Sequence, residues 1–266
     1  SIVSHFSAEV AGRIPLVMII IFGLIYVLAG FLMQRNGRHI KFLIPGAMIV
    51  FVVLSLESNP NKHIHIPEYI LLAGILYEAI ALDYEGKGIF ILIFVCASML
   101  GVVDELAQGL HPQRHYGLGD MAVNSASALI GVLLLMGLRD PPRGDWRWIS
   151  YLKGMQLWGV IAFLGLSGAG LMCFYLKKVQ INNGFWGSYP IWLLGWNGIF
   201  LALSLGAGYA FFFKGYKRYR PSGAKDSSTR IDFMKTVYLW IFPPLTILFI
   251  AQLLPMVLGV SGWNFK

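Results

Sequence analysis

The chain has 266 residues, of which 21 are basic and 13 acidic. Charged residues make up 13 % of it, about half of the roughly 25 % typical of soluble globular domains. Hydrophobic residues make up 57 %, and the mean hydropathy is +0.66. This composition excludes a disordered chain, a coiled coil and an ordinary cytosolic enzyme, because a soluble protein of this size would leave too much apolar surface in water. We expect a lipid bilayer to surround most of the chain.

Eight apolar runs follow one another along the chain, and most approach the 20 residues or so that a helix needs to cross the hydrocarbon. They are too long for strands and lack strict alternation of apolar and polar side chains. The sequence therefore predicts an all-α, polytopic membrane bundle with about eight transmembrane helices. The predicted spans are residues 14–33, 42–56, 67–82, 89–107, 121–138, 154–176, 189–213 and 236–260, and the second and third are the shortest.

The basic residues of the connections divide unequally between the two sides of the membrane. The loops after the first, third, fifth and seventh spans carry 15 of the 21, and the remaining loops and both tails carry six. Since Lys and Arg stay on the cytoplasmic side, we expect a bacterial inner-membrane protein with both termini outside. The net charge of +8 then belongs to loops that face anionic lipid, so bound lipids are expected and nucleic acid is not.

A polar segment with two prolines, residues 140–145, ends the fifth span and cannot continue a helix. It predicts a five-helix membrane unit over residues 1–140 and a three-helix extension over residues 141–266. The five spans before it carry nearly all the intramembrane polar residues. The extension is apolar and aromatic, apart from a basic cytoplasmic loop at residues 214–235.

Two connections on the predicted outer side carry an unusual density of polar side chains. On a helical fourth span Asp104 and Gln108 share a face, and on the fifth span Asp120 and Asn124 do the same. Arg114 lies in the turn between them, where its planar guanidinium suits a carboxylate or a ligand anion. Carboxylates at membrane depth need counter-charges. From the residues alone, the candidates for a functional or structural polar cluster are Asp104, Glu105, Gln108, Arg114, Asp120 and Asn124. Lys62 and His65 are further candidates as counter-charges.

The spacing of these residues resembles the VanZ-like membrane family. The pattern is Asp-Glu-x-x-Gln at residues 104–108, followed by Arg114, Asp120 and Asn124. In that family a Lys-x-x-His-x-x-x-Tyr pattern precedes a span, and Lys62, His65 and Tyr69 are similar to it here. The resemblance adds Tyr69 to the candidate cluster. It covers roughly residues 15–138 and implies a small polytopic fold with a shared polar site, but no settled reaction.

Several interpretations of these residues stay open. The cluster either binds a polar head group, a glycan or a peptide at the outer face, or it is an ion-pair network between helices; catalysis by a carboxyl with a raised pKa is a narrower version of the first. Glu78 inside the third span is a proton-relay candidate or pairs with a Ser, Asn or Lys nearby. All six histidines are expected in tails or loops, which argues against haem or chlorophyll ligation inside the membrane and leaves an outer metal site open.

Two hypotheses for function follow. The first is an envelope protein that binds its ligand at the outward polar cluster. The alternative is a non-catalytic accessory subunit of a larger membrane complex, respiratory or photosynthetic, in which the cluster is structural and the extension faces other membrane subunits. No catalytic residue, metal ligand or cofactor is predicted, because the chain has no Walker loop, no dinucleotide fingerprint and no nucleophile elbow.

Overall fold

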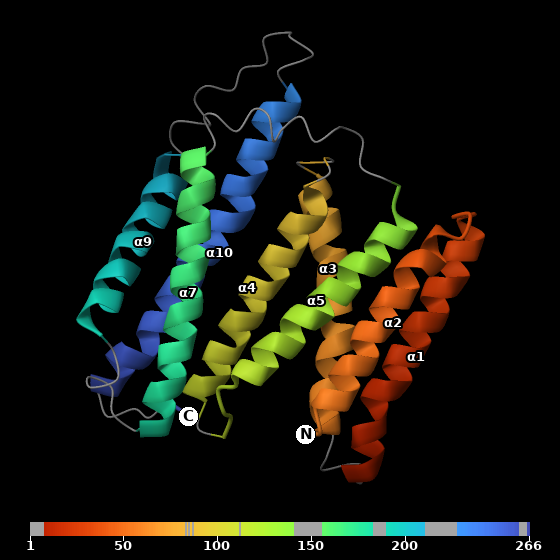
Figure 1. Cartoon of the computed structure of the whole chain (residues 1–266), viewed down its shortest axis with the longest axis horizontal. Helices are drawn as coiled ribbons and strands as arrows, with labels where there is room; N and C mark the ends of the chain where they lie inside the picture. Colours follow the sequence, from red (N-terminus) through yellow and green to blue (C-terminus); the bar gives the residue numbers. More distant parts are fainter. Residues whose placement is uncertain are drawn as a thin grey trace. The chain divides into compact units, whose positions relative to one another are not determined.

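The predicted all-α fold class is confirmed by a computed structural model. The structure describes residues 8–82, 84, 86, 88–111, 113–140, 156–182, 190–210, 228–260 and 265–266. Within them lie eight α-helices and one 3-10 helix, and no strand. Each of the eight predicted spans overlaps one α-helix (Figure 1). In chain order the elements are α1 (Ala8–Leu32), α2 (Arg38–Leu56), η2 (Pro60–Ile64), α3 (His65–Ala81), α4 (Ile89–Leu110), α5 (Leu118–Leu138), α7 (Gln156–Asn182), α9 (Ile191–Ala210) and α10 (Ser228–Val260).

Contacts divide the chain into two compact units. The first contains residues 1–81, 89–98 and 119–142, and the second contains residues 82–88, 99–118 and 143–266. The second half of α4 and the loop after it therefore belong with the C-terminal helices. The division into domains at residue 140 stays a prediction.

In the first unit, α1 packs against α2, η2 and α3. The buried core of this unit contains Val53, Ile66 and Ile130 from α2, α3 and α5. Gly131 lets α5 approach α3 closely, because a Cβ at this position would lie only 2.7 Å from the Cβ of Ala73. Small residues at such crossings are how membrane helices gain van der Waals contact when lipid supplies no hydrophobic driving force.

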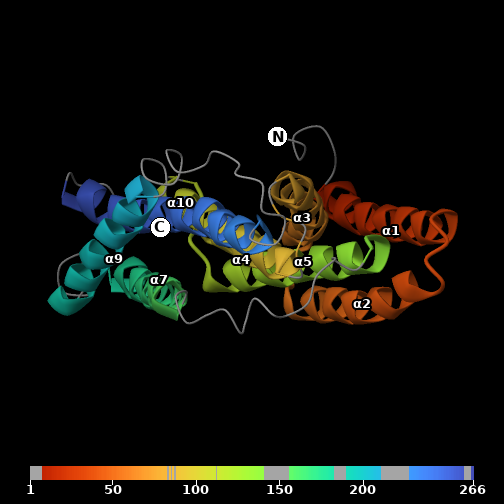
Figure 2. The same ribbon diagram turned by 90° about the horizontal axis from the view of Figure 1, so that it is seen from above.

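In the second unit, α7, α9 and α10 pack against one another (Figure 1; Figure 2). The ring of Phe200 on α9 stacks on that of Phe249 on α10, with 6.1 Å between centroids. Gln252 on α10 is fully buried, and its Nε2 donates to the carbonyl oxygen of Ala169 on α7 at 2.8 Å. This interhelical hydrogen bond ties α10 to α7 inside an otherwise apolar contact.

Among the described residues, six helical stretches are long and apolar enough to cross a membrane: Gly12–Leu32, Arg38–Leu56, Pro60–Ala81, Ile89–Leu110, Leu118–Leu138 and Trp240–Leu258. Large apolar side chains on α1 are exposed, such as Leu24 and Leu28, as lipid-facing side chains are. The chain is thus a multi-pass membrane protein. The second and third predicted spans, the shortest by sequence, both lie among these six. The bacterial inner membrane and the outward termini stay predictions.

Three histidines of the described residues lie in helices, so the expectation that all six lie in tails or loops is wrong. His39 is in the first turn of α2, inside a candidate span, His63 is in the 3-10 helix η2, and His65 begins α3. The apolar run that predicted the second span excludes charged residues, whereas the helix itself starts earlier, at Arg38. It starts there because Gly37 adopts a left-handed φ of 74° that ends the turn after α1. His39 is buried, and its carbonyl oxygen accepts a hydrogen bond from the Tyr26 hydroxyl at 2.9 Å.

Candidate functional site

The nine residues of the predicted polar cluster are distributed over both units. The first unit holds Lys62, His65, Tyr69, Asp120 and Asn124. The second unit holds Asp104, Glu105, Gln108 and Arg114. Each unit therefore has its own polar site.

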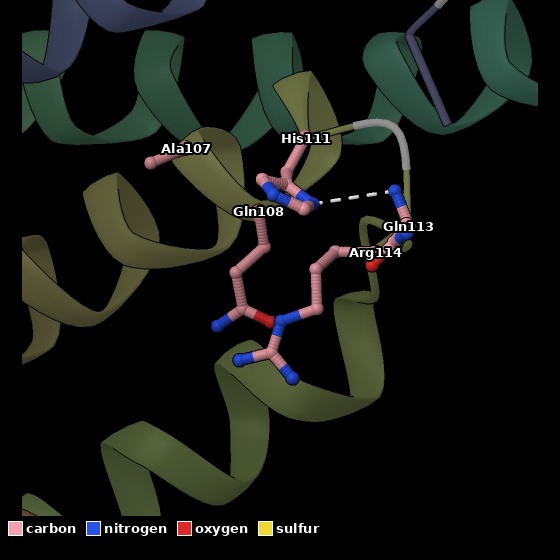
Figure 3. A pocket seen from close by; sticks show the side chains of 5 residues that line it. All are labelled: Ala107, Gln108, His111, Gln113 and Arg114. Carbon is pink, nitrogen blue, oxygen red and sulfur yellow. Dashed lines mark hydrogen bonds between the residues drawn. The ribbon is translucent and has the colours of Figure 1, made fainter. Parts of the chain in front are cut away.

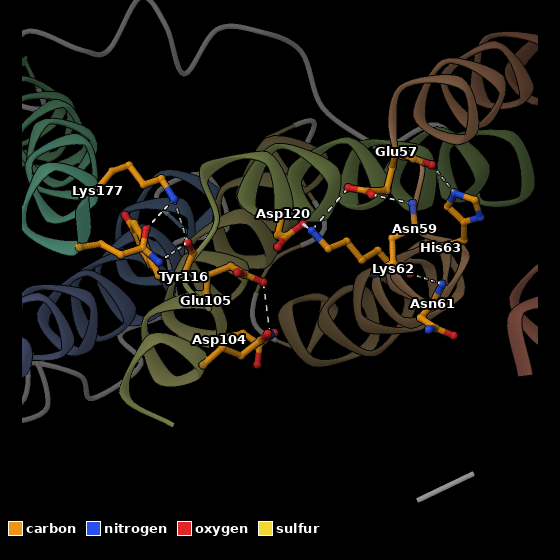
Figure 4. A network of polar contacts seen from close by, with 12 residues as sticks. Glu57, Asn59, Asn61, Lys62, His63, Asp104, Glu105, Tyr116, Asp120 and Lys177 are labelled. Atoms are coloured by element: carbon orange, nitrogen blue, oxygen red, sulfur yellow. Dashed lines mark hydrogen bonds and ion pairs between the residues drawn. The ribbon is translucent and has the colours of Figure 1, made fainter. Parts of the chain in front are cut away.

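Lys62 is the centre of the polar site in the first unit (Figure 4). Its Nζ lies 2.5 Å from Oδ1 of Asp120 and 3.6 Å from Oε2 of Glu57. The side chains of Glu57 and Asp120 are only 17 % and 12 % exposed, so both carboxylates are largely removed from water. The ammonium group of Lys62 compensates the cost of desolvating them, which makes this site a closed ion-pair network.

The local sequence explains why Lys62 reaches both carboxylates. Asn59 caps the 3-10 helix η2 by accepting the backbone N–H of Asn61 at 3.1 Å, and Pro60 follows at the first helical position. The backbone N–H of Asn59 in turn donates to Glu57 Oε1 at 2.9 Å. A ring nitrogen of His63 lies 2.9 Å from the carbonyl oxygen of Glu57. These short-range bonds fix the turn between α2 and α3 and aim Lys62 across it.

The other three predicted residues of the first unit are His65, Tyr69 and Asn124. His65 Nδ1 lies 3.2 Å from Oε2 of Glu68, which is on the same helix. Tyr69 is buried, 6.4 Å from the ring of His65 between centroids. Asn124 is fully buried one helical turn after Asp120, and its carboxamide has no hydrogen-bond partner among the described residues.

The second unit's site begins on the last turns of α4. Gln108 Nε2 donates to Asp104 Oδ2 at 2.9 Å and to Glu105 Oε1 at 3.2 Å, which confirms that Asp104 and Gln108 share a face. Asp104 is exposed, whereas Glu105 is fully buried. A carboxamide has two N–H donors, and both are directed at carboxylates here. Its carbonyl oxygen, Oε1, is therefore the group that Gln108 offers to a ligand.

A pocket of about 450 Å³ opens beside Gln108 (Figure 3). It is lined by Ala107, Gln108, His111, Gln113 and Arg114. The close-up shows the side chains of Gln108 and Arg114 extending to the same side of the pocket. Arg114 is exposed, and within the described part of the chain it makes no ion pair. Two partners were predicted for Arg114, a carboxylate or a ligand anion. No protein carboxylate pairs with it among the described residues, and the ligand anion stays a prediction.

His111 supplies a second donor to this pocket. The backbone N–H of Gln113 donates to His111 Nδ1 at 3.2 Å (Figure 3). A neutral imidazole whose Nδ1 accepts a hydrogen bond carries its proton on Nε2. The pocket therefore offers the guanidinium of Arg114 and the Nε2–H of His111 as donors, and Oε1 of Gln108 as an acceptor. This set can hold an anion beside a group that donates a hydrogen bond.

Glu78, the proton-relay candidate, is ion-paired. Its Oε1 contacts an Nη atom of Arg139, and the Arg139 guanidinium lies 4.8 Å from the centroid of the Tyr77 ring. Glu78 thus has a polar partner, but that partner is an Arg and not the expected Ser, Asn or Lys. In the residues that the structure describes, no three His, Cys, Asp or Glu side chains are placed to share a metal ion.

Sequence reasoning missed two residues of these sites, Glu57 and His111. Glu57 comes directly after the second apolar run, where it looked like the end of a span. Its position five residues before Lys62 was the available sign that the two side chains could form an ion pair. His111 counted only among the six histidines that left an outer metal site open, because the backbone hydrogen bond that fixes its tautomer depends on the turn and is not visible in the sequence.

Comparison with protein-family models, with curated proteins and with solved structures finds no match for the chain. The class that the fold and the sites define is a multi-pass helical membrane protein with a closed ion-pair network in one unit and an open polar pocket in the other. The resemblance to the VanZ-like family stays a prediction.

Proposed function

We propose that this chain is a VanZ-like membrane protein that binds an anionic, hydroxyl-bearing head group of the cell envelope, such as a phosphoglycerol group, in the pocket beside Arg114. The observation that carries the proposal is the state of Arg114. It is exposed, it lines the pocket, and it makes no ion pair within the described residues. A guanidinium presents five donors in a planar fork that matches a phosphate or carboxylate.

The other pocket groups narrow the ligand further. The Nε2–H of His111 adds a donor for the same anion, and Gln108 Oε1 needs an O–H or N–H donor from the ligand. A phosphate ester next to a free hydroxyl satisfies all three groups. A choline head group satisfies only the first two, because a quaternary ammonium has no hydrogen to donate to Gln108.

The carboxylates of Asp104 and Glu105 do not oppose this assignment. Gln108 directs both of its N–H groups at them. Gln108 itself lines the pocket, whereas Asp104 and Glu105 are not among the lining residues. They orient Gln108, which makes them positioning residues for the proposed ligand.

The position of the pocket along α4 also supports a head group. The apolar stretch that can cross a membrane ends at Leu110, and the pocket lining begins at Ala107 and continues to Arg114. Groups at the end of a span lie at the level of lipid head groups. On the predicted topology this end of α4 faces outward.

The direct test is a titration of the purified full chain in a neutral detergent with short-chain phosphatidylglycerol, followed by microscale thermophoresis. Arg114→Gln should weaken binding about 10- to 100-fold, since a hydrogen-bonded charge contributes roughly 1.5–3 kcal/mol. Glycerol phosphate in a second titration separates recognition of the head group from recognition of the acyl chains. Short-chain phosphatidylcholine should bind more weakly than phosphatidylglycerol.

Lys178→Gln is the matched control, because it removes a positive charge from the same unit but from a side chain that lies over the rings of Phe174 and Tyr175. It should leave the dissociation constant unchanged. Equal binding of phosphatidylglycerol by the wild type and by Arg114→Gln would reject the pocket as its site.

We propose as a second candidate that the chain is an accessory subunit of a larger membrane complex. The observation behind it is that α9 exposes Trp192 and Trp196, 54 % and 48 % of whose surfaces are accessible. Aromatic side chains of this size are enriched at protein interfaces. Purification in mild detergent tests it: a lone, stable and ligand-binding species of 29.7 kDa rejects the subunit hypothesis.

A further inference from the structure

We infer that Phe265 and Lys266 form a clasp that holds the pocket loop, residues 109–116, and so positions Arg114 for its ligand. The role of the clasp in positioning Arg114 for a ligand rests on the proposed function. Its geometry stands on hydrogen bonds and packing within the second unit. No feature of the sequence indicates it, because the two segments lie about 150 positions apart.

The backbone of Lys266 bridges both ends of the pocket loop. Its N–H donates to the carbonyl oxygen of Gly109 at 2.9 Å, and its carbonyl oxygen accepts the N–H of Tyr116 at 2.7 Å. Gly109 is in the last turn of α4, and Tyr116 comes two residues before α5. One residue thus closes the loop that contains His111, Gln113 and Arg114.

The side chain of Phe265 packs beside this bridge and stabilises it. It is 4 % exposed, and its ring lies 5.1 Å from that of Tyr116 between centroids. Gly109 faces the same ring, and a Cβ at Gly109 would lie 2.6 Å from Cζ of Phe265. Such a distance is not tolerated by real Cβ atoms, so glycine is required here for close approach rather than for its backbone conformation.

Tyr116 connects the same end of the loop to α7. Its hydroxyl donates to the carbonyl oxygen of Cys173 at 2.7 Å, and its own carbonyl oxygen accepts from Gln180 Nε2 at 3.1 Å. Lys177 Nζ lies 3.5 Å from that oxygen. The Tyr116 ring is buried between the clasp and α7, which makes it the fixed point of the loop.

The middle of the loop contrasts with its ends. His111, Gln113, Arg114 and His115 are all exposed. The one backbone hydrogen bond that the structure gives inside it runs from the Arg114 N–H to the carbonyl oxygen of His111 at 3.1 Å. The two ends of the loop, Gly109 and Tyr116, are therefore held from outside it, while the side chain of Arg114 is exposed and available to a ligand. Without the clasp, ligand binding would have to order the loop and would lose affinity by that cost.

A mobility measurement tests the clasp independently of any ligand. Cys96 and Cys173 are both buried, so a nitroxide reagent should label an introduced Gln113→Cys selectively. In the full chain the spin label should report a restricted loop. Adding Phe265→Ala should increase its mobility, and adding Gly109→Ala should do the same by pushing the Phe265 ring away. Phe265→Leu, which keeps part of the packing, should give an intermediate line shape.

The affinity measurement then tests the purpose of the clasp. Phe265→Ala should weaken glycerol phosphate binding about tenfold. The mobility of the loop should rise, while the unfolding temperature should change little. Unchanged mobility in both Phe265→Ala and Gly109→Ala would overturn the clasp. A mobile loop with unchanged affinity would overturn its role in positioning Arg114. If the wild type does not bind glycerol phosphate, the proposed function and this role fail together, while the spin label still decides whether Phe265 and Lys266 hold the loop.

Discussion

Lys62 in the first unit and Arg114 in the second are both cations near the end of a membrane span, but they have opposite surroundings. Lys62 lies between two largely buried carboxylates, with Asp120 at 2.5 Å and Glu57 at 3.6 Å. Arg114 is exposed beside a pocket of about 450 Å³ and makes no ion pair among the residues described. Both residues belong to the same predicted cluster, so residue type and spacing alone did not distinguish them.

The difference teaches what a charge near a membrane is used for. A cation that neutralises buried carboxylates is needed for folding, because removing it leaves carboxylates desolvated without compensation. A cation without a protein partner is not needed for folding and is available to an external anion. The two interpretations first offered for the whole cluster therefore apply to different halves of it: the ion-pair network describes the first unit, and the ligand site is our proposal for the second.

The largest expected effect is that of Lys62→Met on stability. It leaves Asp120 and Glu57 facing each other without a cation, and we expect a loss of about 2 kcal/mol, less than the 3–5 kcal/mol of a fully buried pair because Lys62 is partly exposed. Thermal unfolding in lipid nanodiscs measures it. Adding Asp120→Asn should restore part of the loss. Arg114→Gln should change stability by less than about 0.5 kcal/mol, and equal losses in the two variants would remove the distinction between the two sites.

A smaller effect is expected when the open site is given a carboxylate of its own. Ala107 is exposed and lines the pocket, so Ala107→Glu places a negative charge near Arg114 without filling a buried space. We expect affinity for glycerol phosphate to fall about fivefold, since an exposed ion pair contributes up to roughly 1 kcal/mol. The reduction should shrink in high salt.

Ala107→Gln has nearly the same shape without the charge and is the matched control for this experiment. It should bind as the wild type does. If Ala107→Gln weakens binding as much as Ala107→Glu, the loss comes from steric obstruction and says nothing about the charge state of Arg114.

How far the sequence could predict these features depends on the range of the interactions behind them. Apolar runs of helical length are local, so each predicted span falls on an α-helix, and the shared face of Asp104 and Gln108 followed from helical spacing alone. The start of α2 was misplaced, because a glycine with positive φ, and not a change in hydropathy, sets it.

Features that join distant segments were not predictable from one sequence. The bridge from Lys266 to Gly109 and Tyr116 needs three segments to meet, and its hydrogen bonds use backbone atoms that every residue has. His65 was expected to compensate the clustered carboxylates, and the structure gives it an ion pair with Glu68, one helical turn away. Local competition of this kind decides which of several charges pair, and spacing along the chain does not rank them.

The smallest expected effect, and the sharpest test of the closed site, is that of Glu57→Gln. With Lys62 present the replacement removes a 3.6 Å ion pair that Asp120 already largely satisfies, so stability should fall by about 0.5 kcal/mol or less. In the Lys62→Met background the sign should reverse, because Glu57 and Asp120 then repel each other and neutralising one of them relieves the repulsion. A double-mutant cycle of unfolding free energies measures this reversal. If Glu57→Gln destabilises both backgrounds equally, Lys62 does not couple the two carboxylates. In that case the contribution of Glu57 comes from its hydrogen bond with the backbone of Asn59 alone.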